Sequence, residues 1–83
     1  MTANTPDIKL HDVASSQISR IGYDPGMSRL RVQFKQKGLP GPVYEYQNVD
    51  IEQYRAFYDS PSKGKHFAQH FKGNERHPHR KIG

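Results

Sequence analysis

The chain has 83 residues and no cysteine, and its 13 lysines and arginines against 8 acidic residues give a formal net charge of +5. This length allows one small domain with a modest core and excludes a separate catalytic domain, while the lack of cysteine excludes disulfides and thiolate sites. No apolar run approaches the roughly 20 residues that span a bilayer. A basic chain of this size favours an anionic partner, either a nucleic acid or an acidic protein surface.

Residues 1–12 are polar, with Pro6 among them and only Ile8 and Leu10 to bury, which predicts a flexible leader. The first residues lack the basic start and the apolar stretch of a signal peptide. Together with the absence of cysteine, this favours a cytoplasmic setting.

Three strands are expected over residues 15–24, 29–35 and 43–47, because these segments are rich in β-branched and aromatic residues or alternate in polarity. The middle segment is the clearest: Leu30, Val32 and Phe34 alternate with polar residues, as on a strand with one buried face. A glycine- and proline-rich connection is expected over residues 37–42. Three strands with such links predict an antiparallel meander.

Two short helices should follow the strands. Asp50 and Gln53 have the spacing of a capping box, and a stripe of apolar residues follows, namely Ile51, Tyr54, Phe57 and Tyr58. Pro61 should end this helix and begin the next one with Ser60 as its cap. The second helix carries Phe67 and Phe71 and should stop at residues 73–74. The predicted fold class is therefore α+β, with a three-stranded antiparallel meander packed against two short C-terminal helices and with flexible termini.

The charge is distributed unevenly along the chain. Residues 1–59 hold as many acidic as basic side chains, so the whole excess lies in residues 60–83. That part contains Glu75 as its single acidic residue against six lysines and arginines. We expect a folded domain over residues 13–73 and a basic, flexible tail over residues 74–83.

An ordered series of motifs resembles the KTSC domain, a small domain found at the C-terminus of some lysyl-tRNA synthetases and as a stand-alone protein in bacteria and phages. The series covers roughly residues 13–72 and consists of Ser15-Ser16, Ile18, Ile21-Gly22-Tyr23-Asp24, Leu30-x-Val32-x-Phe34, Val43-Tyr44-x-Tyr46 and Ser60-Pro61-Ser62-Lys63-Gly64-Lys65. The resemblance implies a nucleic-acid-binding or RNA-associated accessory role and carries over no catalytic residue. The longer connection at residues 37–42 and the basic ending depart from the family pattern.

The segment from Ser60 to Lys65 is the first candidate site. Its hydroxyls (Ser60, Ser62), its lysines (Lys63, Lys65) and the free N–H groups of a helix start could hold a phosphate. The alternative is a helix cap with solvated lysines. A nucleotide-binding P-loop is excluded, because His66 follows Lys65 where that motif requires serine or threonine.

The second candidate is the outer face of the middle strand, where Arg29 and Arg31 could follow a phosphate backbone. The alternative is an ordinary solvated sheet face on which these arginines pair with Glu45 of the next strand.

Two further residue types are assigned structural roles. We expect the core to contain Tyr46, Phe34, Phe57, Phe67 and Phe71, so no aromatic ring is identified as a stacking platform. His66 and His70 have the spacing of zinc ligands on a helix, but no cysteine accompanies them, and exposed histidines are the favoured interpretation.

These observations predict a non-enzymatic protein that binds RNA or single-stranded nucleic acid, without a cofactor or a metal. The binding residues would be Lys63, Lys65 and Lys72 with Ser60 and Ser62, and then Arg29 and Arg31. The alternative function is an adaptor, of a bacterial or phage type, whose basic helix binds an acidic surface of a partner protein.

Overall fold

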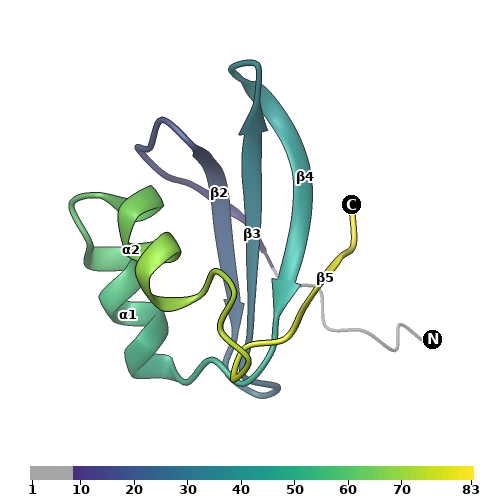
Figure 1. The fold of residues 1–83 in the computed structure, drawn as a ribbon, viewed down its shortest axis with the longest axis vertical. Coiled ribbons are helices and arrows are strands. Elements are labelled where there is room, and N and C mark those ends of the chain that lie inside the picture. Colours follow the sequence, from purple (N-terminus) through teal and green to yellow (C-terminus); the bar gives the residue numbers. More distant parts are fainter. Residues whose placement is uncertain (1–8) are drawn as a thin grey trace.

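The computed structural model describes residues 9–83; the part of the predicted leader before Lys9 lies outside the described residues. The elements in chain order are β1 (His11–Asp12), β2 (Ile18–Asp24), β3 (Arg29–Gln36), β4 (Leu39–Tyr46), α1 (Ile51–Asp59), α2 (Lys63–His70) and β5 (His79–Lys81). The strands form one antiparallel sheet in the order β1-β2-β3-β4-β5. Both helices lie on the same side of this sheet (Figure 1).

The α+β class, the central meander and the two helices are confirmed, but the expected strand number of three was wrong. The two additional strands are β1 and β5, which are two and three residues long and lie at the two edges of the sheet. All their side chains are exposed, so they carry no alternation of buried and polar residues. Their extended conformation comes from pairing with β2 and β4, which a local pattern does not reveal.

The expected long connection at residues 37–42 is a two-residue turn. Lys37 and Gly38 both have positive φ, 54° and 78°, which is typical of the tight turns that join hairpin strands. The prolines that suggested a loop, Pro40 and Pro42, lie inside β4. Proline is tolerated at this place because the adjoining stretch of β4 is at the edge of the sheet, beyond the end of β5 (Figure 1).

The core lies between the helices and one face of the sheet. It consists of Ile18, Ile21, Leu30, Val32, Tyr46, Val49, Phe57, Phe67 and Phe71. Ile18 and Ile21 are three positions apart, and both are fully buried because a register shift between residues 18 and 20 turns the strand. Phe34 packs against this core but stays partly exposed, so of the five aromatic core residues expected, it is the incompletely buried one.

The first helix begins as expected. The Asp50 side chain accepts a hydrogen bond from the Gln53 N–H at 2.8 Å, and the Gln53 side chain accepts one from the Asp50 N–H at 2.9 Å. The predicted apolar stripe is only partly buried: Phe57 is buried, whereas Ile51 and Tyr58 are about half exposed (47% and 49%).

The expected cap of the second helix was wrong. α2 begins at Lys63 with Ser62 at the N-cap position, whereas Ser60 is the C-cap of α1. The Ser60 hydroxyl donates to the Ser62 carbonyl at 3.0 Å and accepts from the Ser62 N–H at 3.2 Å. These bonds hold Pro61 in a turn between the helices, so the proline lies outside the first turn of α2.

Part of the C-terminal segment, expected as a basic tail, packs against the domain and pairs with the sheet. His77 is 3% exposed, and its Nδ1 lies 3.0 Å from the Gln47 carbonyl oxygen while its ring packs against Phe71. The Gln47 N–H donates to the Pro78 carbonyl at 3.0 Å. These contacts bring residues 79–81 beside β4, where they pair as β5. Likewise, the expected leader includes His11 and Asp12, which pair with β2.

Candidate functional site

The start of α2 lies against the segment that precedes β2. Gly64 marks the closest approach: a Cβ atom built on it would lie 2.5 Å from the Gln17 side-chain oxygen. Between the two segments is a pocket of about 470 Å³, here called the lysine pocket. It is lined by Ala14, Ser15, Ser16, Gln17, Pro61, Ser62, Lys63, Gly64, Lys65 and Ala68. The fold therefore brings the Ser15-Ser16 pair to the Ser62–Lys65 segment.

The lysine pocket has the character of an anion site. No side chain caps the first turn of α2. Its backbone N–H groups, which lie at the positive end of the helix dipole, therefore have no side-chain acceptor. Lys63 donates to the Ser60 carbonyl at 3.1 Å, and Lys35 donates to the Ser15 carbonyl at 2.6 Å, which places two ammonium groups beside the pocket. Lys65 is exposed. An anion entering here would meet cations, hydroxyls and N–H donors.

A second hollow adjoins the lysine pocket between α2 and the sheet. This aromatic groove has a volume of about 630 Å³ and is lined by Gln17, Phe34, Pro42, Tyr44, Tyr46, Gly64, Phe67, Ala68, Lys72, Gly73 and His79. Gln17, Gly64 and Ala68 line both hollows. A groove of rings and a cationic pocket are therefore parts of one continuous surface.

The rings of the aromatic groove hold one another in place. The Phe34 and Tyr44 ring centroids lie 5.8 Å apart at 71°, and those of Tyr46 and His79 lie 5.2 Å apart in a stacked arrangement. Phe34 and Tyr44 are half-buried and His79 is exposed, so each keeps part of its ring accessible. Burial raises the pKa of Tyr46 to about 12.

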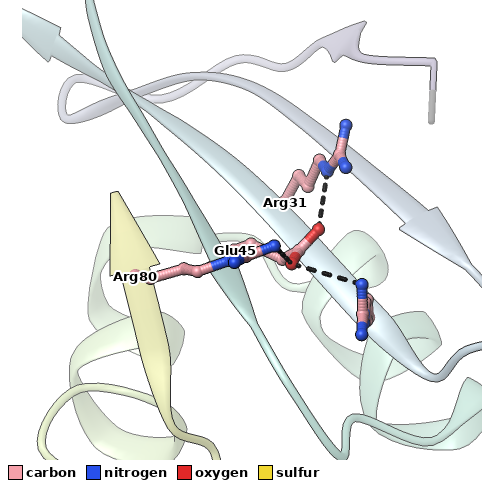
Figure 2. A network of polar contacts seen from close by, with 4 residues as sticks. Arg31, Glu45 and Arg80 are labelled. Atoms are coloured by element: carbon pink, nitrogen blue, oxygen red, sulfur yellow. Dashed lines mark hydrogen bonds and ion pairs between the residues drawn. The ribbon is translucent and has the colours of Figure 1, made fainter. Parts of the chain in front are cut away.

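The structure does not bring Arg29 and Arg31 to this surface. Both lie on the opposite side of the sheet, where Figure 2 shows Glu45 between Arg31 and Arg80 with the helices behind the strands. Arg31 Nε is 3.0 Å from a Glu45 carboxylate oxygen, and an Arg29 nitrogen is 3.6 Å from the other oxygen. The alternative in which these arginines pair with Glu45 thus describes the geometry. We call Arg29, Arg31, Arg80 and Glu45 the arginine face.

Of the two histidines on α2, His66 is partly buried and His70 is exposed. The His66 and His70 ring centroids are 4.3 Å apart. Burial and the neighbouring His70 lower the pKa of His66, with burial the larger cause. Within residues 9–83, no group of three or more histidine, cysteine or acidic side chains has the geometry to hold a metal ion.

Of the residues predicted from the sequence, Ser62, Lys63 and Lys65 line the lysine pocket and Lys72 lines the aromatic groove, whereas the groove itself was not predicted. Tyr44, Tyr46 and Phe34 share a face through the alternation of β3 and β4, a signal that was present in the sequence. His79 joins these rings only because β5 pairs with β4, and no local sequence pattern predicts that pairing. Of the predicted hydroxyls, Ser60 is engaged within the turn between the helices and does not line the lysine pocket.

A family model, described as the KTSC domain, matches residues 14–74. The chain belongs to the KTSC domain family. The matched range includes every residue that lines the lysine pocket, whereas β5 lies beyond it. In the described part of this KTSC chain, no helix is both long and apolar enough to cross a bilayer.

Two similar proteins illustrate the family. An uncharacterized protein of Stutzerimonas stutzeri (strain A1501) is 38% identical over 58 residues, which cover 70% of this chain and 76% of that protein. The crystal structure of a KTSC domain protein from Yersinia pestis is 36% identical, with a TM-score of 0.80, and the match covers 92% of this chain and 99% of that chain.

Proposed function

We propose that this KTSC protein is a non-enzymatic module that binds single-stranded nucleic acid along α2. The observation that carries the proposal is the continuity of the lysine pocket with the aromatic groove through Gln17, Gly64 and Ala68. Single-stranded nucleic acids alternate an anionic phosphate with an aromatic base. Proteins that bind them combine a positively charged track with rings on which bases stack.

The two hollows divide these tasks. A phosphate in the lysine pocket would lie near Lys63 and Lys65 and at the uncapped start of α2. An adjacent base would lie in the aromatic groove against Tyr44 or His79, with Lys72 at the border for the next phosphate. Stacking recognises the face that all bases share, so the binding is expected to tolerate many sequences.

An acidic protein surface is the alternative partner of the same lysines. Lysine on a flexible stem serves an acidic protein as well as a phosphate. The aromatic groove favours a nucleic acid over an acidic protein as the partner, because its accessible rings lie beside the lysines. Proteins that bind single strands combine cations and stacking rings in this way.

The test is the anisotropy of short, labelled RNA and DNA single strands titrated with the protein at several salt concentrations. Lys65→Ala and Arg55→Ala form a matched pair, since each removes one exposed helical cation, and Arg55 lines neither hollow. Lys65→Ala should weaken binding and reduce the slope of log K against log salt by about 0.7, the value for one lost phosphate contact on a single strand. Arg55→Ala should leave the slope unchanged. Equal effects of the two substitutions would refute the site.

A further inference from the structure

The arginine face is a second basic surface, on the side of the sheet that the helices leave uncovered (Figure 2). Three guanidinium groups converge on one carboxylate, with nitrogen–oxygen distances to Glu45 of 3.6 Å from Arg29, 3.0 Å from Arg31 and 3.4 Å from Arg80. Glu45 is 1% exposed, while the Arg80 side chain is 62% exposed. The carboxylate is covered by the arginines. Arg80 faces the solvent, while the Arg29 and Arg31 side chains are 26% and 19% exposed.

The cluster keeps a positive excess, because three arginines surround a single carboxylate. Arg20 of β2 adds no charge, since it pairs with Asp12 at 2.9 Å. Asp24 lies opposite Arg29 in the strand register and offsets part of its charge. The excess is therefore greatest around Arg31 and Arg80, towards β5.

Glu45 orients the arginines without using up their hydrogen-bonding capacity. A guanidinium group has about five N–H donors in a planar fork. Arg31 and Arg80 each make one hydrogen bond to Glu45, through Nε and through a terminal nitrogen respectively. The remaining donors are held in orientation by the pairing, so a phosphate that they bind finds the side chains already ordered.

We propose that the arginine face binds the phosphate backbone of a nucleic-acid duplex without reading its bases. The side chains that face this side around Glu45 are charged or polar, namely Arg29, Arg31 and Gln33 of β3, Asp24 of β2 and Arg80 of β5. Val43 is the apolar residue that the register of β4 adds. Interfaces with nucleic acid are more polar and more positively charged than interfaces with proteins, whose centres are rich in apolar and aromatic side chains.

A duplex fits this face better than a single strand. Single-strand sites use aromatic rings, and the rings of this protein that line a groove lie on the helix side of the sheet. A duplex presents ordered phosphates that need no stacking partner. The proposal goes beyond the single-strand function and does not depend on it, since the two surfaces share no lining residue.

The experiment compares two double variants that remove the same charge. Arg29→Gln with Arg80→Gln alters the arginine face and keeps the 3.0 Å Arg31–Glu45 pair, while Lys65→Ala with Lys72→Ala alters the helix side. Labelled DNA and RNA hairpins without overhangs are titrated at several salt concentrations. The arginine variant should lower the slope of log K against log salt by about 1.8, which is about 0.9 for each lost duplex contact, and the lysine variant should leave it unchanged.

Three results would overturn the proposal. One is an unchanged hairpin slope in the arginine variant, and another is an equal reduction in both variants. The third is binding of a poly-glutamate peptide as tight as that of the hairpin and equally sensitive to the arginine substitutions, which would indicate an acidic protein partner. If circular dichroism shows that the arginine variant does not fold, the arginine Nε–H resonances of the wild-type protein are followed during hairpin titration. Shifts of Arg29, Arg31 and Arg80 support the face, and their absence excludes it.

Discussion

The lysine pocket and the arginine face carry the same sign of charge on opposite sides of one sheet, but the cations are held in different ways. Every ion pair within residues 9–83 is made by an arginine, and three of these pairs share Glu45. The lysines of α2 have no such carboxylate. Lysine acts as a mobile point charge, whereas a paired arginine has a set direction. The difference separates a surface that adapts to its ligand from one that presents a fixed array.

The largest expected effect comes from removing the residue that fixes the arginines. Glu45→Ala leaves three like charges together without their shared acceptor, so we expect the free energy of unfolding to fall by about 1.5–3 kcal/mol, the usual contribution of hydrogen bonds to a charged group. Urea denaturation followed by circular dichroism measures it. Glu75→Ala, which removes an exposed carboxylate, is the matched control and should change stability little. Equal losses in both variants would mean that Glu45 does not organise the face.

The second effect concerns the helix side alone. Tyr44→Leu keeps an apolar side chain on β4 but removes a ring from the aromatic groove, so single-strand binding should weaken by about 1–3 kcal/mol for one lost stacking contact. Tyr58→Leu changes a half-exposed tyrosine of α1 outside the groove and serves as the control. Anisotropy with a labelled single strand measures both. Similar affinities for the two variants would remove the groove from the binding site.

A third substitution separates stability from binding at the junction of the two hollows. Gly64→Ala should stabilise α2 by up to about 1 kcal/mol, because alanine favours a helix more than glycine does. The added methyl group would displace the flexible end of Gln17, which forms part of both hollows. We expect a higher Tm together with weaker single-strand binding and unchanged hairpin binding. A variant that binds single strands as well as the wild type would show that this junction is not occupied.

The smallest effect is a pH dependence confined to α2. Burial, and then His70, lower the pKa of His66 below its ordinary 6.5, so the unfolded chain takes up this proton at a higher pH than the folded one. The stabilisation is fully present above about pH 6.5 and is lost as the pH falls through the folded pKa. Tm should therefore decrease between about pH 7.5 and pH 5. In His66→Gln the decrease should be smaller, and an identical decrease would assign it to other groups.

The parts of the fold that sequence predicted are those encoded by neighbouring residues. The alternation from Arg29 to Lys35 gave β3, and the Asp50–Gln53 spacing gave the start of α1, since both depend on short-range geometry. β5 was missed because its extended form follows from the burial of His77 and from pairing with β4, contacts between segments far apart in the chain.

The same distinction applies to the candidate sites. The lysines were identified from a single run of sequence, and Glu45 was considered as a partner of the adjacent strand. The contribution of Arg80 required β5 to be in place. The aromatic groove required α2 to lie over β3 and β4, which is a matter of packing that composition and spacing do not determine.

The edges of the sheet bear on how this protein behaves at high concentration. An unpaired strand edge is a template for the strand of another molecule and hence a route to aggregation. Along the outer side of β4, the lower part is covered by β5, a strand of three exposed residues, His79, Arg80 and Lys81, while the upper part contains Pro40 and Pro42 (Figure 1). Proline has no N–H to donate, and like-charged strands repel one another. This edge is therefore protected against pairing with further copies along its whole length, by charge in one half and by proline in the other.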